Sequence, residues 1–134
     1  MSLTLHSALD MIAASLGKAA EIGVPMVVAV VDAGGNLIAQ HRQDDSLLAS
    51  IDLALNKAYS AVAVRMPTQE LGLLAQPGGA LYGINTDNGG RLVSFGGGLP
   101  VLRDGVLLGG IGVSGGSVEQ DVACAEAGLA ALAR

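Results

Sequence analysis

A small group of charged side chains has the chemistry needed to act on an organic acid. Arg42 and Lys57 could hold the carboxylate of such a ligand through charge-assisted hydrogen bonds. Asp44, Glu119 and Asp121 could exchange protons with it if burial raised the pKa of their carboxyl groups. This set would suit a small oligomeric enzyme, with its pocket at a subunit interface, that isomerises, hydrates or deaminates an unsaturated carboxylic acid.

These residues also have structural interpretations. Glu119 and Asp121 fall in the first turn of an expected helix, where carboxylates stabilise the helix dipole. Lys57 falls in the middle of another expected helix, where a solvated polar position is equally plausible. The chain contains no recognisable Ser-His-Asp set, no HExxH motif and no phosphate-binding GxxxxGKS/T motif. Residue chemistry alone leaves open whether the protein is an enzyme.

Both histidines could offer an imidazole to a ligand. His6 lies near the start of an expected helix, one residue from its apolar stripe, where a partly exposed histidine is common. His41 shares one face of an expected strand with Leu37 and Ala39, so we expect it on the core side of that strand. A lone histidine in such a position is more often part of a hydrogen-bonded structure than a ligand.

A glycine-rich stretch separates apolar runs between residues 92 and 116. The triple glycine Gly96, Gly97 and Gly98 divides the first run from the second, and Asp104-Gly105 divides the second from the third. Asp-Gly between apolar runs is a strong hairpin signal, so three consecutive antiparallel strands are expected. Glycines at strand ends either make tight turns and close packing or form a loop that faces a ligand.

The remaining pattern predicts helices on an antiparallel sheet. Strands are expected over 26–31 and 37–42, and residues 81–85 are either a short strand or irregular. Helices are expected over 4–22, from a cap within 43–46 to about 65, over 68–75 with Thr68 as cap, and from Ser117 or Val118 to about 133. The fold class is therefore α+β, with about five antiparallel strands.

Composition limits the possible partners. The 134 residues form one expected domain, 1–134, and a 51% hydrophobic content with 14% charged residues suggests that some apolar surface meets another subunit. A net charge of −5 and 2% aromatic residues argue against nucleic acid. The longest apolar run, 26–31, is too short to cross a membrane, and without a signal peptide a cytoplasmic location is expected. Cys124 is the single cysteine, so neither a disulfide nor a metal site is expected.

Several segments keep an order that we find in a known family. They are 30–37 (VVDAGGNL), 42–44 (RQD), 55–61 (LNKAYSA), 67–68 (PT), 96–101 (GGGLPV) and 109–121 (GGIGVSGGSVEQD). Together they resemble the GlcG/HbpS-like family, which includes the C-terminal domain of PduO-type proteins and is described as haem-binding or haem-degrading. The resemblance covers nearly the whole chain.

The resemblance implies a profilin-like fold, a single five-stranded antiparallel sheet flanked by helices, assembled into dimers or octamers. It also implies haem as a cofactor, with a threonine or a histidine at the iron. The Pro-Thr motif carries the threonine to Thr68, while a histidine ligand would be His6 or His41. Many relatives read Arg-Met-Asp-Gly where this chain has Arg-Gln-Asp-Asp at 42–45, so the edge of the pocket differs.

Three functions follow from these observations. The first is a small-ligand-binding accessory protein of a catabolic operon, which binds haem or a related planar or tetrapyrrole cofactor in an oligomer. The second is the enzyme acting on an unsaturated acid. The third is an oligomeric scaffold without a ligand.

Overall fold

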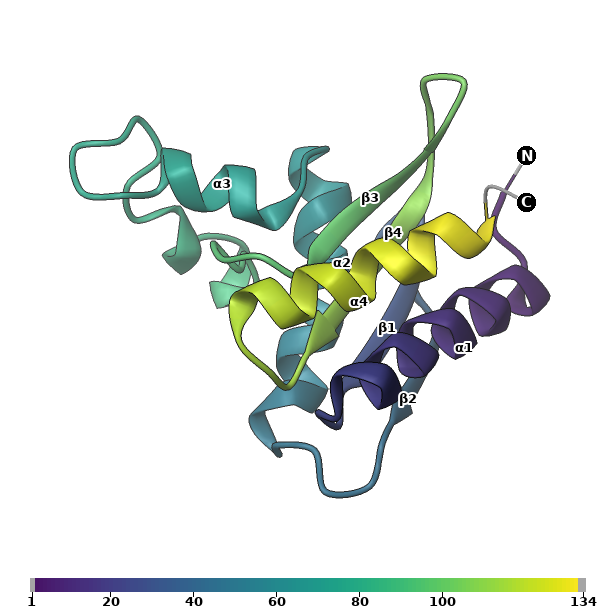
Figure 1. Ribbon diagram of the computed structural model, residues 1–134. Helices are drawn as coiled ribbons and strands as arrows, with labels where there is room; N and C mark the ends of the chain where they lie inside the picture. The colour runs from purple at the N-terminus through teal and green to yellow at the C-terminus, as the bar shows by residue number, and fades with distance from the viewer. Residues whose placement is uncertain (1, 133–134) are drawn as a thin grey trace.

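The computed structural model describes residues 2–132 and contains a four-stranded antiparallel sheet with helices on both faces (Figure 1). The strands are β1 (Val27–Asp32), β2 (Leu37–Arg42), β3 (Gly98–Arg103) and β4 (Val106–Ser114). The helices are α1 (Leu5–Ile22), α2 (Ala49–Val64), α3 (Thr68–Leu74) and α4 (Val118–Leu132), with short 3₁₀ turns at Ile84–Thr86 and Asn88–Gly90.

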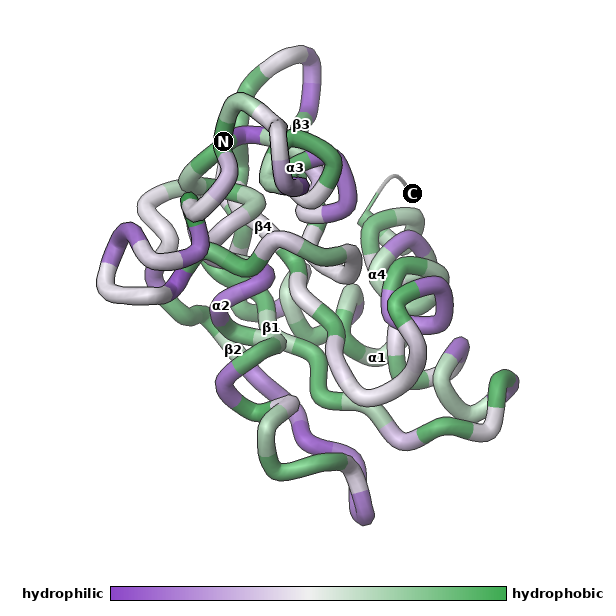
Figure 2. The backbone as a smooth tube through the Cα atoms, turned by 90° about the vertical axis from the view of Figure 1, so that its left-hand side faces the viewer, coloured by the Kyte–Doolittle hydropathy of each residue, from purple (hydrophilic) through white to green (hydrophobic). Residues whose placement is uncertain are grey.

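The sheet has the order β2-β1-β4-β3, which places the most apolar strands in its centre. Residues 27–31 of β1 are fully buried, because this strand pairs with β2 on one side and β4 on the other. Val28 and Val30 face α1 and α4, while Val27 and Ala29 pack against α2. Hydropathy along the chain follows this arrangement, with apolar segments in the interior and polar ones at the outer loops (Figure 2).

Small residues bring the helices close to one another and to the sheet. Where α1 meets α4, the Ser15 hydroxyl donates a hydrogen bond of 2.6 Å to the Cys124 carbonyl. On the opposite face, a Cβ at Gly112 of β4 would collide with the Ala54 carbonyl of α2. This contact explains why glycine occupies the middle of a buried strand, where it otherwise weakens the strand.

The helix predictions are largely confirmed. The first helix begins after Thr4, whose hydroxyl accepts from the Ser7 amide at 3.0 Å. The start expected for the last helix at Ser117 or Val118 is also confirmed by a capping box, in which Ser117 Oγ accepts from the Gln120 amide and Gln120 Oε1 accepts from the Ser117 amide. The cap predicted within 43–46 is wrong, because the second helix begins at Ala49 and the Ser46 hydroxyl donates to the Gln43 carbonyl instead.

The expected fifth strand does not form. The segment 92–97 precedes β3 without forming a strand of its own, although Leu92 and Val93 are buried. Its Val93 amide donates instead to Ser60 Oγ of α2 at 2.8 Å, whereas the Gly97 carbonyl, directly before β3, accepts from the Val113 amide of β4. Residues 81–85 are likewise not a strand, since a 3₁₀ turn occupies Ile84–Thr86. The profilin-like class stays a prediction.

Two further features bear on function. Within residues 2–132, no helix has both the length and the apolar character needed to span a bilayer. The same residues contain no group of three or more histidine, cysteine or acidic side chains that could hold a metal ion.

Candidate functional site

A buried ion pair joins α2 to α4. Lys57 Nζ donates to Asp121 Oδ2 and to the Val113 carbonyl of β4, each at 2.9 Å. The side chain of Lys57 is 0% exposed and that of Asp121 is 4% exposed. The interpretation of Lys57 as a solvated position is wrong, because the side chain points inward from α2 to the end of β4.

The ion pair is enclosed by further polar and aromatic contacts. Asp121 Oδ1 accepts from the Gly116 amide at 2.9 Å, and the Phe95 ring centroid lies 4.9 Å from Lys57 Nζ. The ammonium group therefore has two hydrogen-bond acceptors and one aromatic face, which matches its three donors. Within residues 2–132, Lys57 Nζ is therefore not among the buried polar atoms that lack a hydrogen-bond partner.

Burial shifts the pKa values of the two partners in opposite directions. Loss of water lowers the pKa of Lys57, and the adjacent Asp121 carboxylate opposes this change. Burial raises the pKa of Asp121, while Lys57 and the Gly116 amide oppose it. In both residues, burial makes the charged form less stable. The ion pair therefore carries a free-energy cost of desolvation, which its close contacts offset.

The triple glycine packs directly against this lysine. Gly97 has a φ of 129°, and a Cβ on it would lie 2.8 Å from Lys57 Nζ. The Gly98 amide donates to Thr68 Oγ1 at 2.9 Å, and Thr68 is fully buried. Thr68 therefore does not cap α3, in which it is the first helical residue after Pro67. These contacts favour close packing as the reason for the glycines.

The structure thus brings together part of the predicted set. Lys57, Asp121, Thr68, Gly97 and Gly98 form one buried cluster. Gly96 lies at its border, where a Cβ would press against Val118 and Val122 of α4. Glu119, which was expected in the same first turn as Asp121, is exposed.

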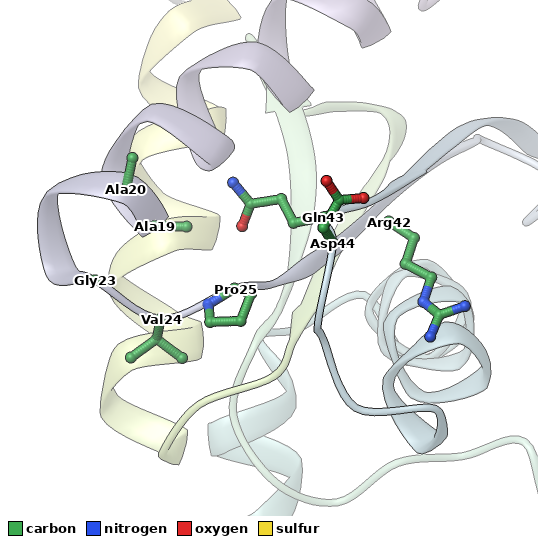
Figure 3. Close-up of a pocket in the computed structure, with 8 residues that line it drawn as sticks. All are labelled: Ala19, Ala20, Gly23, Val24, Pro25, Arg42, Gln43 and Asp44. Atoms are coloured by element: carbon green, nitrogen blue, oxygen red, sulfur yellow. The ribbon is translucent and has the colours of Figure 1, made fainter.

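Arg42 and Asp44 lie elsewhere, at an open surface cleft of about 490 Å³ (Figure 3). One wall comes from the end of α1 and the segment after it, with Ala19, Ala20, Gly23, Val24 and Pro25, and the other comes from Arg42, Gln43 and Asp44. Gln43 is fixed there, because its Oε1 accepts from the Met26 amide at 2.7 Å. The cleft therefore combines an apolar wall with a charged one.

The two histidines lie apart from the buried cluster. His6 is 88% exposed, with its Nε2 3.5 Å from Asp10 Oδ2. His41 pairs with Val28 and so shares the sheet face that carries α1, but it is exposed because β2 is an edge strand. Its expected place on the core side of the strand is confirmed, although its side chain is exposed. The rise of α1 separates His6 from the cleft at Ala20 by roughly 20 Å.

Some contacts near these sites escaped the sequence analysis. Phe95 was interpreted as part of a strand, yet its ring covers the lysine. Arg91 lies over the Tyr59 ring, with its guanidinium carbon 3.6 Å from the centroid. Tyr59 lies two positions after Lys57 on α2, and an aromatic residue is rare in this chain, which is the signal that could have drawn attention to it.

Comparison with known proteins gives a consistent picture. The family described as "Haem degrading protein HbpS-like" matches residues 3–130. A 15.0 kDa protein from the dhaT-dhaS intergenic region of Citrobacter freundii is 48% identical over 96% of this chain and 90% of its own length. The corrinoid adenosyltransferase PduO of the same organism is 46% identical over 98% of this chain, which spans only 39% of that protein.

A solved structure extends the similarity to three dimensions. The PduOC:haem complex superposes with a TM-score of 0.94 at 44% identity, covering 98% of this chain and 95% of the other. At this level of identity, the arrangement of helices and strands described above is shared with a chain that was crystallised with haem.

Proposed function

Because the chain belongs to the HbpS-like family, we propose that it is a small-ligand-binding protein that takes up haem in an oligomeric assembly. The observation that carries this proposal is its similarity to the PduOC:haem complex. The adenosyltransferase activity in the name of PduO is not part of the proposal, since this chain corresponds to a minor part of that protein.

The residues of the cleft fit the chemistry of haem. Its apolar wall, which includes Val24 and Pro25, suits a flat hydrocarbon ring, and Arg42 suits the carboxylates of the porphyrin. His41 is not one of the residues that line the cleft, but it directly precedes Arg42 on the exposed edge strand, and imidazole is a good ligand for iron. Bound haem would supply an iron centre with an open coordination position for that imidazole.

The other predicted iron ligands fit less well. Thr68 is fully buried, and its hydroxyl already accepts from Gly98, so an external ligand would reach it only after α3 had moved. His6 is accessible but lies at the opposite end of α1 from the cleft. We therefore place His41 first, His6 second and Thr68 third.

An assembly would complete such a site. The cleft is open to solvent, and a haem resting on one protomer would leave much of its apolar surface exposed. We propose that a second copy of the chain covers it, in a dimer or an octamer. The cytoplasmic location and the link to a catabolic operon stay predictions.

Haem titration tests this function. We expect the wild type and His6→Ala to take up haem stoichiometrically with a Soret band, and His41→Ala to shift that band and to bind at least tenfold more weakly. The two variants control for each other, because each removes one exposed imidazole. Uptake no greater than that of an albumin control would overturn the proposal, and a shift in His6→Ala alone would move the ligand to His6. Native mass spectrometry of the same samples measures the assembly.

The alternative function, an enzyme acting on an unsaturated acid, receives less support. Lys57 and Asp121 satisfy each other in the interior, with no exposed surface on the lysine that a substrate could reach. Arg42 and Asp44 lie at a different place, so the two cations do not converge on one carboxylate. A screen of small unsaturated acids in the wild type, Lys57→Ala and Asp121→Asn would revive it if turnover depended on these residues.

A further inference from the structure

Three contacts hold Arg91 against α2, and a fourth fixes the ring on which it stacks. Its guanidinium carbon lies 3.6 Å from the centre of the Tyr59 ring, and its Nε donates to Asn56 Oδ1 at 3.5 Å. Its backbone carbonyl accepts from the Ser60 hydroxyl at 3.1 Å. Asn88 fixes the ring from the other end, donating to the Tyr59 hydroxyl at 3.0 Å. The plane of the guanidinium is therefore set before any ligand arrives.

The outer edge of this guanidinium has no partner among residues 2–132. None of the ion pairs within these residues includes Arg91, and its terminal nitrogens donate no hydrogen bond to any described acceptor. A Cβ added at the neighbouring Gly89 or Gly90 would have no atom within 4 Å, so the segment just before Arg91 is loosely surrounded. A stacked arginine whose terminal nitrogens lack a partner is preorganised for an acceptor with two oxygens.

We propose that Arg91, stacked on Tyr59, is a binding site for the carboxylate of a small organic acid. The planar carboxylate matches the fork of two parallel N–H groups, and the stacking removes the entropy cost of ordering a free arginine. Asp52 lies close by, because its Oδ2 accepts a hydrogen bond from Asn56 Nδ2 at 3.1 Å. This negative charge disfavours a doubly charged phosphate more than a singly charged carboxylate.

The site is independent of the proposed haem function. It lies on α2 and the 3₁₀ turn at Asn88–Gly90, whereas the cleft lies between the end of α1 and the residues after β2. The binding experiment below uses protein without haem, so its result does not depend on whether haem binds.

Titration with propionate and with inorganic phosphate, followed by amide and arginine Nε resonances in NMR spectra, tests the proposal. At constant ionic strength, we expect propionate to shift the resonances of Gly89, Gly90 and Arg91, and to bind more tightly than phosphate. Arg91→Ala should weaken binding about tenfold, and Arg91→Lys, which keeps the charge but loses the fork and the stack, at least threefold. Tyr59→Phe keeps the ring and should stay within about twofold of the wild type.

Arg65→Asn is the matched control for a general effect of positive charge. Arg65 is exposed and has a φ of 55°, a conformation that asparagine tolerates. We expect this variant to bind propionate as the wild type does. The site would be overturned if Arg91→Ala bound propionate as tightly as the wild type, if Arg65→Asn lost as much affinity as Arg91→Ala, or if residues 89–91 showed no shifts. Tighter binding of phosphate than of propionate would overturn its assignment to carboxylates.

Discussion

Lys57 Nζ lies 2.9 Å from Asp121 Oδ2 in the protein interior, and this contact fastens the middle of α2 to the first turn of α4. The two helices lie on opposite faces of the sheet (Figure 1). The ion pair therefore ties together both layers around the end of β4.

Breaking this pair should destabilise the fold strongly. Lys57→Met removes the ammonium group and leaves the Asp121 carboxylate buried without its partner, which should lower the free energy of unfolding by about 3–5 kcal/mol. Urea denaturation measures the change. Lys18→Met is the control, because Lys18 makes only a surface contact of 3.6 Å with Glu21 and should change stability by less than about 1 kcal/mol.

A double variant separates the pair from its surroundings. Lys57→Met with Asp121→Leu replaces both charges by apolar groups, and it should be more stable than the sum of the two single changes predicts. Additive losses would contradict the direct coupling of the two side chains.

Stability should depend on pH through Lys57. Burial lowers its pKa below the ordinary value of 10.5, so between the two values the unfolded chain binds more protons than the folded chain. The contribution of Lys57 to the free energy of unfolding therefore rises with pH across this window and is lost as pH falls through the folded pKa. We expect the free energy of unfolding of the wild type, minus that of Lys57→Met, to increase from about pH 7 to about pH 10.5 when both are measured by urea denaturation. A difference that stays constant or falls with pH would contradict the lowered pKa of Lys57.

Gly97→Ala should be more harmful than an alanine at another glycine with positive φ. A Cβ at Gly97 would lie 2.5 Å from the Val113 carbonyl oxygen and 2.8 Å from Lys57 Nζ, whereas Gly83, with a φ of 89°, has nothing within 4 Å. Both changes carry backbone strain of about 1–3 kcal/mol, but only the first also displaces the lysine. The urea midpoints of the two variants compare them directly, and equal losses would show that Gly97 is required for its backbone conformation alone.

Cys124 should resist alkylation in the folded protein. Burial is the main cause that raises its pKa from 9.0 to about 11, and the nearby Asp121 carboxylate adds to the shift. The reactive thiolate is then scarce at neutral pH, so iodoacetamide should react at least about a hundredfold more slowly than in urea. A cysteine placed at exposed position 33 in a Cys124→Ser background provides the control, and comparable native rates at both positions would contradict the prediction.

The elements with strong local signals could be predicted from the sequence. The apolar stripe of the first helix and the Asp104-Gly105 hairpin depend on neighbouring residues, and the structure has both of them. The segment 92–95 has the same apolar character as a strand. Its Val93 amide donates to Ser60, which is distant in sequence, and no local pattern encodes that choice.

The sequence indicated individual residues of the candidate site, but not which of them contact one another. Lys57 and Asp121 were both candidates, but their spacing of 64 residues contains no information that they meet. The separation of Lys57 and Asp121 from Arg42 could not be predicted either, because it depends on how α2 packs on β4. The stack of Arg91 on Tyr59 has the same origin, since a loop and a helix far apart in sequence produce it.

The glycines of β4 fix the distance between this strand and α2. At Gly110 and Gly112, the backbone of α2 rests on the backbone of the strand, with the carbonyls of Ala58 and Ala54 where side chains would otherwise lie. A gap of this kind cannot be adjusted by repacking side chains, because none intervenes. Any residue larger than glycine at either position must move α2 away from the strand, and Lys57 with it. The two glycines therefore set the distance between α2 and β4 at which Lys57 Nζ can donate to the Val113 carbonyl.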